Sequence, residues 1–202
     1  MDAVMPEIAA LAADPSPLDR RLIVDGVPFT VRALRTEDAA ALVLFLSGLS
    51  GGSRRFWHGA TGHAAEATGW IEAIGRYDKL RLVAHPDDHP ADLAGVADLS
   101  FSLPDHAELA RYADYGLPLD PDRTVRWGPC VANAWQGRGL AAALLEPAWD
   151  AARLLARDRV VLFGGVHRDN HRARRFYLRH GFTEAGTFTT DDGPGIDMTR
   201  PI

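Results

Sequence analysis

One segment, residues 131–141 with the sequence VANAWQGRGLA, constrains the fold of this chain more than any other. It follows an apolar stretch typical of a strand and precedes an apolar pattern with helical spacing. Gly137 and Gly139 have no side chains, so the backbone here can approach a ligand closely. The first turn of a helix also presents unpaired N–H groups and the positive end of its dipole. The segment therefore predicts a strand–loop–helix unit that holds an anion, typically a phosphate, with a contact from Arg138.

Composition restricts the class of protein. The chain has 202 residues, which favours a single domain, and it is 47% hydrophobic and 24% charged, as is common in globular proteins. The formal net charge of −5 does not favour general binding to nucleic acid or to an anionic membrane. Cys130 is the single cysteine, which excludes an internal disulfide and a CxxC metal site.

The N-terminal residues do not resemble a secretory signal, because Asp2, Glu7 and Asp14 lie among them and a basic start is lacking. No apolar run approaches the ~18 residues that a membrane-spanning helix needs. We therefore expect a cytoplasmic protein with no membrane partner.

The chain is expected to comprise an extension, residues 1–22, and one domain, residues 23–202. The hydrophobic patterns predict the order β-α-α-β-β-β-α-β-α-β-β, with a loop at 47–63 that carries Arg54, Arg55, Phe56 and Trp57 and an insertion at 102–124. Pro147 predicts a kink or a restart within the helix that follows the glycine loop. We expect an α/β (α+β) fold with a mixed, mostly antiparallel central sheet and helices on both faces.

A dinucleotide-binding fingerprint is an alternative interpretation of the glycine loop. Gly137, Gly139 and Ala142 match the pattern G-x-G-x-x-A, which would favour a nucleotide-dependent oxidoreductase. However, the pattern occurs late in the chain, after several predicted strands. No acidic residue ends the following strand, VVLFGGV, to bind a ribose.

A second motif favours another family. Residues 136–141 have the form Q-x-x-G-x-A, and residues 170–182, NHRARRFYLRHGF, have the form N-x-x-A-x-x-F-Y-x-x-x-G-F. One predicted helix and one predicted strand separate them. This pair resembles the GNAT superfamily of acyl-CoA-dependent N-acyltransferases. The resemblance implies the GNAT fold, acetyl-CoA as co-substrate and no metal.

The resemblance also implies which residues bind the cofactor. Six consecutive residues would bind the CoA pyrophosphate, mostly through backbone N–H groups: Gln136, Gly137, Arg138, Gly139, Leu140 and Ala141. Cys130, Val131 and Ala132, on a strand that the family splays from its neighbour, would pair with the pantetheine amides. Asn170 would hydrogen-bond to the pantetheine arm, and Ala173 of the same motif would also contact the cofactor.

The chemistry of acyl transfer explains the remaining assignments. An amine with a pKa near ~10.4 must lose its proton before it attacks a thioester. By the resemblance, Tyr177 would protonate the departing thiolate. Relatives that resemble protein-lysine acetyltransferases often carry a glutamate on the strand before the loop, but residues 124–130 contain no carboxylate. Asp98 is our candidate base, and a water chain or a basic backbone site is the alternative.

Simpler roles compete with these assignments. Asn170 is also a suitable N-cap, and Tyr177 is also a suitable core aromatic residue. Cys130 has no histidine or aspartate at a spacing that indicates a nucleophile, and the pair His167 and His171 lacks a third metal ligand.

The sequence therefore predicts an N-acetyltransferase that uses direct attack in a ternary complex. The acceptor would be a small-molecule amine or a protein or peptide amine. A GNAT-like sensor that binds acyl-CoA with little or no catalysis is the alternative. We expect no nucleic-acid partner, and homodimer formation remains open.

Overall fold

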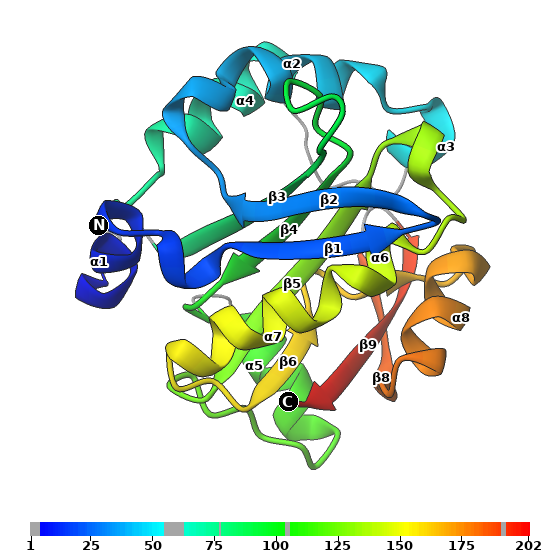
Figure 1. The fold of residues 1–202 in the computed structure, drawn as a ribbon. Coiled ribbons are helices and arrows are strands. Elements are labelled where there is room, and N and C mark those ends of the chain that lie inside the picture. The colour runs from blue at the N-terminus through cyan, green and yellow to red at the C-terminus, as the bar shows by residue number, and fades with distance from the viewer. Residues whose placement is uncertain (1–4, 55–62, 77, 104–105, 191–192) are drawn as a thin grey trace. The chain divides into compact units, whose positions relative to one another are not determined.

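The computed structural model describes residues 5–54, 63–76, 78–103, 106–190 and 193–202. Its helices are α1 Pro6–Ala13, α2 Ala39–Gly48, α3 Gly51–Arg54, α4 His63–Glu72, α5 His106–Asp114, α6 Leu140–Ala143, α7 Leu145–Leu154 and α8 His171–Arg179 (Figure 1). Its strands are β1 Arg20–Val24, β2 Val27–Ala33, β3 Lys79–Pro86, β4 Gly95–Ser100, β5 Thr124–Val131, β6 Arg159–Leu162, β7 Val166–His167, β8 Thr183–Thr190 and β9 Gly193–Pro201.

These strands form a mixed sheet of nine strands. The pairs β1–β2, β2–β3, β6–β9, β7–β9 and β8–β9 are antiparallel, whereas β5 and β6 are parallel. The predicted mixed, mostly antiparallel sheet is thus confirmed. Contacts divide the chain into one unit of residues 1–98 and 129–151 and a second unit of residues 99–128 and 152–202, and β4 and β5 contribute to both.

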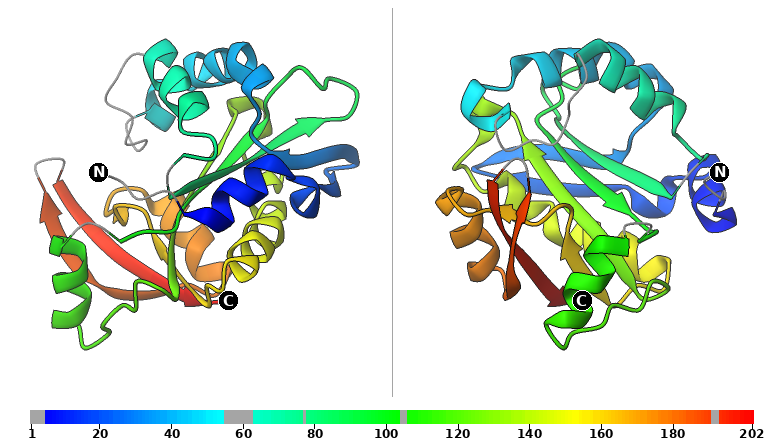
Figure 2. Two further views of the ribbon diagram at one scale, coloured as in Figure 1. Left: turned by 90° about the vertical axis from the view of Figure 1, so that its left-hand side faces the viewer. Right: turned by 180° about the vertical axis from the view of Figure 1, so that it is seen from behind.

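In the first unit, helices cover both faces of the sheet. Val96 of β4 belongs to the hydrophobic core that includes residues of α2 and α4. At its neighbour Gly95, an added Cβ would lie 3.2 Å from both Leu140 of α6 and Leu144. Because successive strand residues point to opposite faces, α2 and α4 pack on one face and α6 on the other (Figure 2). The predicted helices on both faces are confirmed.

Residues 5–24 are ordered parts of the first unit. Ile8 of α1 is 1% exposed, and β1 pairs with β2 through a tight turn in which Val24 opposes Val27. The boundary that we expected after residue 22 falls inside β1. This strand carries no clear sequence signal, because Ile23 is 78% exposed and the apolar residues of the strand do not alternate with polar ones.

In the second unit, the expected insertion at 102–124 contains α5, which packs on the β8–β9 hairpin (Figure 2). Arg111 of α5 donates to the buried carboxylate of Asp197 at 3.0 Å, and the Tyr112 hydroxyl donates to the Met198 carbonyl at 3.1 Å. Both acceptors are on β9. The insertion is therefore a structured helix held by polar contacts to a hairpin far away in the sequence.

The helix after the glycine loop is interrupted, as Pro147 predicted. Helix α6 ends at Ala143 and α7 begins at Leu145, so Pro147 lies in the first turn of α7. An N–H has no intrahelical partner in a first turn, so the proline removes no hydrogen bond there. In the predicted loop 47–63, Arg54 ends α3, while Arg55, Phe56 and Trp57 lie outside the described residues.

Candidate functional site

Strand β5 continues beyond its pairing with β6. The parallel register ends at Trp127 opposite Leu162, where the Phe163 N–H donates to the Trp127 carbonyl at 3.0 Å. Odd-numbered residues of β5 thus turn their polar backbone groups toward the β6 side. The Pro129 carbonyl and the backbone groups of Val131 point toward this edge after the pairing has ended. A proline, which has no N–H, is tolerated in a strand at such an edge.

Two backbone groups at the end of β5 already have hydrogen-bond partners within the first unit. The Ala132 N–H donates to the Ala94 carbonyl at 2.8 Å, so it faces the β4 side. The Val131 carbonyl accepts a hydrogen bond of 3.0 Å from the side chain of Gln136, which also donates to the Ser53 hydroxyl. Gln136 therefore ties the glycine loop back to β5 and fixes the loop's shape.

Cys130 does not have the character of a nucleophile. Its side chain packs against the core formed by α2 and α4. Burial raises the pKa of its thiol to about 12, so the thiol is neutral near pH 7.

The loop itself needs its two glycines for backbone conformation. Gly137 and Gly139 have φ angles of +81° and +93°, a region that side-chain-bearing residues rarely adopt. A Cβ added at Gly139 would have no atom within 4 Å, so the space beside it is open. Within the described ranges, no acceptor is recorded for the N–H groups of Gly137 and Gly139. Leu140 and Ala141 follow as the first residues of α6, whose opening N–H groups lack intrahelical partners.

Arg138 extends from this loop toward the β1–β2 hairpin. Its Nε donates to the Asp25 carboxylate at 2.6 Å, and its guanidinium carbon lies 4.1 Å from the centre of the Trp135 ring. The side chain of Arg138 is 39% exposed, so it is held at one end and accessible to solvent.

In the second unit, Tyr177 lies beside the point where the β5–β6 pairing ends. Its ring meets the Trp127 ring edge-on, with centroids 6.0 Å apart, and also contacts the rings of Phe176 and Phe182. Tyr177 is 9% exposed. Trp127 is the last residue of β5 in the register with β6, so α8 places the Tyr177 ring where the pairing of β5 with β6 ends.

The α8 helix that carries Tyr177 is capped by Asn170. The Asn170 side-chain oxygen accepts from the Ala173 N–H at 3.1 Å. The N-cap role that we considered for Asn170 is thus observed, and contacts of Asn170 and Ala173 with a cofactor remain predictions.

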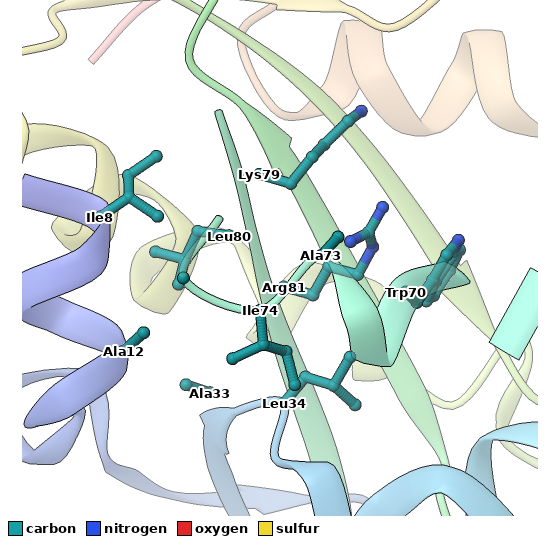
Figure 3. A pocket seen from close by; sticks show the side chains of 11 residues that line it. Ile8, Ala12, Ala33, Leu34, Trp70, Ala73, Ile74, Lys79, Leu80 and Arg81 are labelled. Carbon is teal, nitrogen blue, oxygen red and sulfur yellow. The ribbon is translucent and has the colours of Figure 1, made fainter. Parts of the chain in front are cut away.

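Asp98 of β4 lies between two cations of β3. Its carboxylate oxygens are 3.5 Å from Arg81 Nε and 4.0 Å from Lys79 Nζ. The Arg81 guanidinium in turn lies 4.3 Å from the centre of the Trp70 ring. Figure 3 shows Arg81 and Trp70 side by side, next to an apolar pocket lined by Ile8 and Leu80. The sequence analysis identified Asp98 but neither of its partners.

The structure brings a carboxylate to β5 that the sequence analysis missed. Glu108 of α5 is 2% exposed, and its Oε2 is 3.6 Å from Nη1 of Arg126 on β5. The Arg126 guanidinium also lies 4.8 Å from the centre of the Phe163 ring. The sequence analysis described residues 102–124 only as an insertion and did not single out Glu108.

Two negative findings concern the described part of the chain only. There, no cluster of three or more histidine, cysteine, aspartate or glutamate residues is arranged to hold a metal ion. None of the helices described is both long enough and apolar enough to cross a membrane.

The part of the chain that contains β5, the glycine loop and α8 matches a known domain family. Residues 107–184 match the family model of the acetyltransferase (GNAT) domain. This stretch includes both sequence motifs, and the match confirms the resemblance to the GNAT superfamily that they predicted. No curated protein matches the sequence.

Solved structures share the fold at low sequence identity. The GNAT domain of S. lividans PAT has a TM-score of 0.71 and 20% identity, with 93% of this chain and 99% of that chain covered. The aminoglycoside acetyltransferase AAC(6')-Ib in complex with coenzyme A has a TM-score of 0.64 and 21% identity, covering 86% and 94%. A chimera of spermidine N-acetyltransferase SpeG from Vibrio cholerae and hSSAT has a TM-score of 0.63 and 19% identity, covering 86% and 95%.

Proposed function

We propose that this protein transfers an acetyl group from acetyl-CoA to a primary amine by direct attack in a ternary complex. One observation at the end of β5 carries the proposal. There the strand continues past its parallel pairing with β6 and leads directly into a loop with two glycines at positive φ. Such an edge offers backbone hydrogen bonds to an extended amide-containing chain, and such a loop offers N–H groups to a phosphate.

The directions of the backbone groups at the end of β5 indicate which of them could contact the cofactor. The pyrophosphate would bind the N–H groups of residues 137 and 139–141, with a charge-assisted contact from Arg138. Gln136 would act by shaping the loop, since its side chain already binds the Val131 carbonyl. The pantetheine arm would pair with the Val131 N–H and the Pro129 carbonyl, and the side chains of Cys130 and Ala132 would form the adjacent strand surface. Asn170 and Ala173 would contact the arm from the start of α8.

The reaction requires two proton transfers. The neutral amine nitrogen attacks the thioester carbonyl carbon, and the carbon–sulfur bond breaks as the tetrahedral intermediate collapses. We assign protonation of the thiolate to the Tyr177 hydroxyl, and Asp98 or a water molecule takes the proton that the amine loses. Correct positioning of the two reactants would supply much of the acceleration.

Calorimetric titration and a thiol-release assay test the proposal together. We expect CoA and acetyl-CoA to bind, and acetyl-CoA to release free thiol in the presence of an accepted amine. Ribostamycin, which is bound in a structure of AAC(6')-Ib, and spermidine, the substrate that gives the SpeG enzyme its name, are the first members of an amine panel, to which lysine-containing peptides are added. The absence of any CoA binding at millimolar ligand would refute the proposal.

A second candidate function is an acyl-CoA sensor with little or no catalysis. The ion pairing of Asp98 with Arg81 and Lys79 favours it, because both cations compete with an incoming ammonium for this carboxylate. The thiol-release assay separates the two functions. CoA binding without thiol release for any amine in the panel would support the sensor, whereas release that depends on Tyr177 would support the enzyme.

A further inference from the structure

The turn between β1 and β2 presents a carboxylate in a fixed position. Asp25 and Gly26 form a two-residue turn with φ angles of +51° and +78°, and the flanking residues Val24 and Val27 are paired. An Asp-Gly sequence with positive φ at both positions is typical of the tightest hairpin turns. The position of Asp25 is therefore set by the hairpin.

Asp25 holds the arginine of the glycine loop. The Asp25 Oδ2 accepts from Arg138 Nε at 2.6 Å. The Arg138 guanidinium stacks over Trp135, whose ring meets the fully buried Phe29 ring edge-on, with centroids 4.8 Å apart. Phe29 belongs to β2, so the hairpin supports Arg138 directly through Asp25 and indirectly through the ring of Trp135.

This arrangement leaves the outer end of the guanidinium available. The recorded contacts use Nε and one face of the planar group. In the described parts of the chain, no acceptor is recorded for the two terminal nitrogens of Arg138. A guanidinium bound at Nε still presents these nitrogens as a fork that matches two phosphate oxygens.

We propose that Asp25 is a positioning residue for binding of the cofactor's pyrophosphate. It holds Arg138 in one orientation before the ligand arrives, so that less side-chain freedom is lost when the arginine meets the phosphates. The inference rests on the proposed function, because it assumes that the loop binds CoA. It assigns a role to the β1–β2 hairpin, which lies outside both sequence motifs.

Calorimetric titrations with CoA and with pantetheine, which lacks the pyrophosphate, test the proposal. D25G removes the carboxylate, and D25N removes its charge. Both replacements suit a positive φ, so the turn is retained. R138Q removes the positioned group. D87N is the matched control, because Asp87 makes a comparable ion pair of 2.6 Å with Arg21 of the same hairpin.

We expect D25G to weaken CoA binding about three- to tenfold, a modest effect because the ion pair is half-exposed. D25N should have a smaller effect in the same direction. Neither variant should alter pantetheine binding, and D87N should bind both ligands as the wild type does. In the R138Q background, D25G should cause no further loss of CoA affinity.

Three results would overturn the inference while the proposed function stands. The first is that D25G binds CoA as tightly as the wild type or more tightly. The second is that D25G weakens pantetheine binding as much as CoA binding. The third is that D25G weakens CoA binding in the R138Q background as much as it does in the wild type. A wild-type protein that binds no CoA would overturn the inference and the proposed function together.

Discussion

The Tyr177 ring lies edge-on to the ring of Trp127, the last residue of β5 that remains in register with β6. This contact places the Tyr177 ring at the residue after which β5 is no longer paired with β6. A tyrosine needed only for packing would serve equally well as phenylalanine, whereas an acid for the thiolate would not. The hydroxyl can therefore be tested apart from the ring.

Tyr177→Phe should lower the rate of acetyl transfer about 100-fold, at the lower end of the range for a lost general acid, because a thiolate is already a good leaving group. The ring contacts with Trp127 and Phe182 are retained, so CoA affinity and thermal stability should remain near those of the wild type. Steady-state kinetics and a CoA titration measure both effects. Equal turnover of the variant and the wild type would remove the acid assignment.

Gly139→Glu should abolish measurable CoA binding. The substitution places a negative charge in the open space beside the loop, where we expect the pyrophosphate, and like charges disfavour binding. It also strains the backbone, because Gly139 has a φ of +93°. Calorimetric titration with CoA measures the loss.

Gly116→Glu is the matched control for this strain. Gly116 has a φ of +75° and no atom near an added Cβ, but it lies outside the loop, after α5. Unchanged CoA affinity in a folded Gly139→Glu protein would contradict the placement of the phosphates. An equal loss in Gly116→Glu would show that strain alone is responsible.

The sequence predicted the parts of the site in which local signals coincide. The glycines at 137 and 139 and the helix that begins after Asn170 were both found, because turn and capping preferences act over a few residues. The expected division of the chain after residue 22 did not recognise β1, since an edge strand with an exposed Ile23 lacks the alternation that marks a half-buried strand.

The missed contacts join residues far apart in the chain. Arg111 and Asp197 are 86 positions apart, and Arg138 and Asp25 are 113 positions apart. Each residue alone resembles an ordinary surface charge, and only the fold brings the partners together. The order of most elements along the chain and the motifs were predictable for local reasons, but the groups that orient Arg138 and hold α5 were not.

Stability at low pH should depend on Asp38. Burial by itself raises the pKa of this carboxyl, but hydrogen bonds from Arg32 and the Arg35 N–H outweigh burial and leave the pKa below its ordinary value. The carboxylate thus contributes stability that is fully present above the unfolded pKa of about 3.9 and is lost as the pH falls through the folded pKa.

Asp38→Asn should therefore destabilise the protein at pH 7, and the difference from the wild type should shrink as the pH falls below about 4. Urea unfolding at a series of pH values measures it. A difference that is constant with pH would show that Asp38 contributes only through packing and neutral hydrogen bonds.

The buried pair of Glu108 and Arg126 should matter more for stability than an exposed pair. Glu108→Gln leaves the Arg126 charge buried without its partner, which should lower the free energy of unfolding by about 3 kcal/mol.

Removing both charges with Glu108→Gln and Arg126→Met should cost less than the sum of the single changes, because neither charge is then buried alone. Asp158→Asn, which breaks the half-exposed pair with Arg123, is the control and should have no measurable effect. Additive losses in the double variant, measured by urea unfolding, would show that the two side chains stabilise the protein independently of each other.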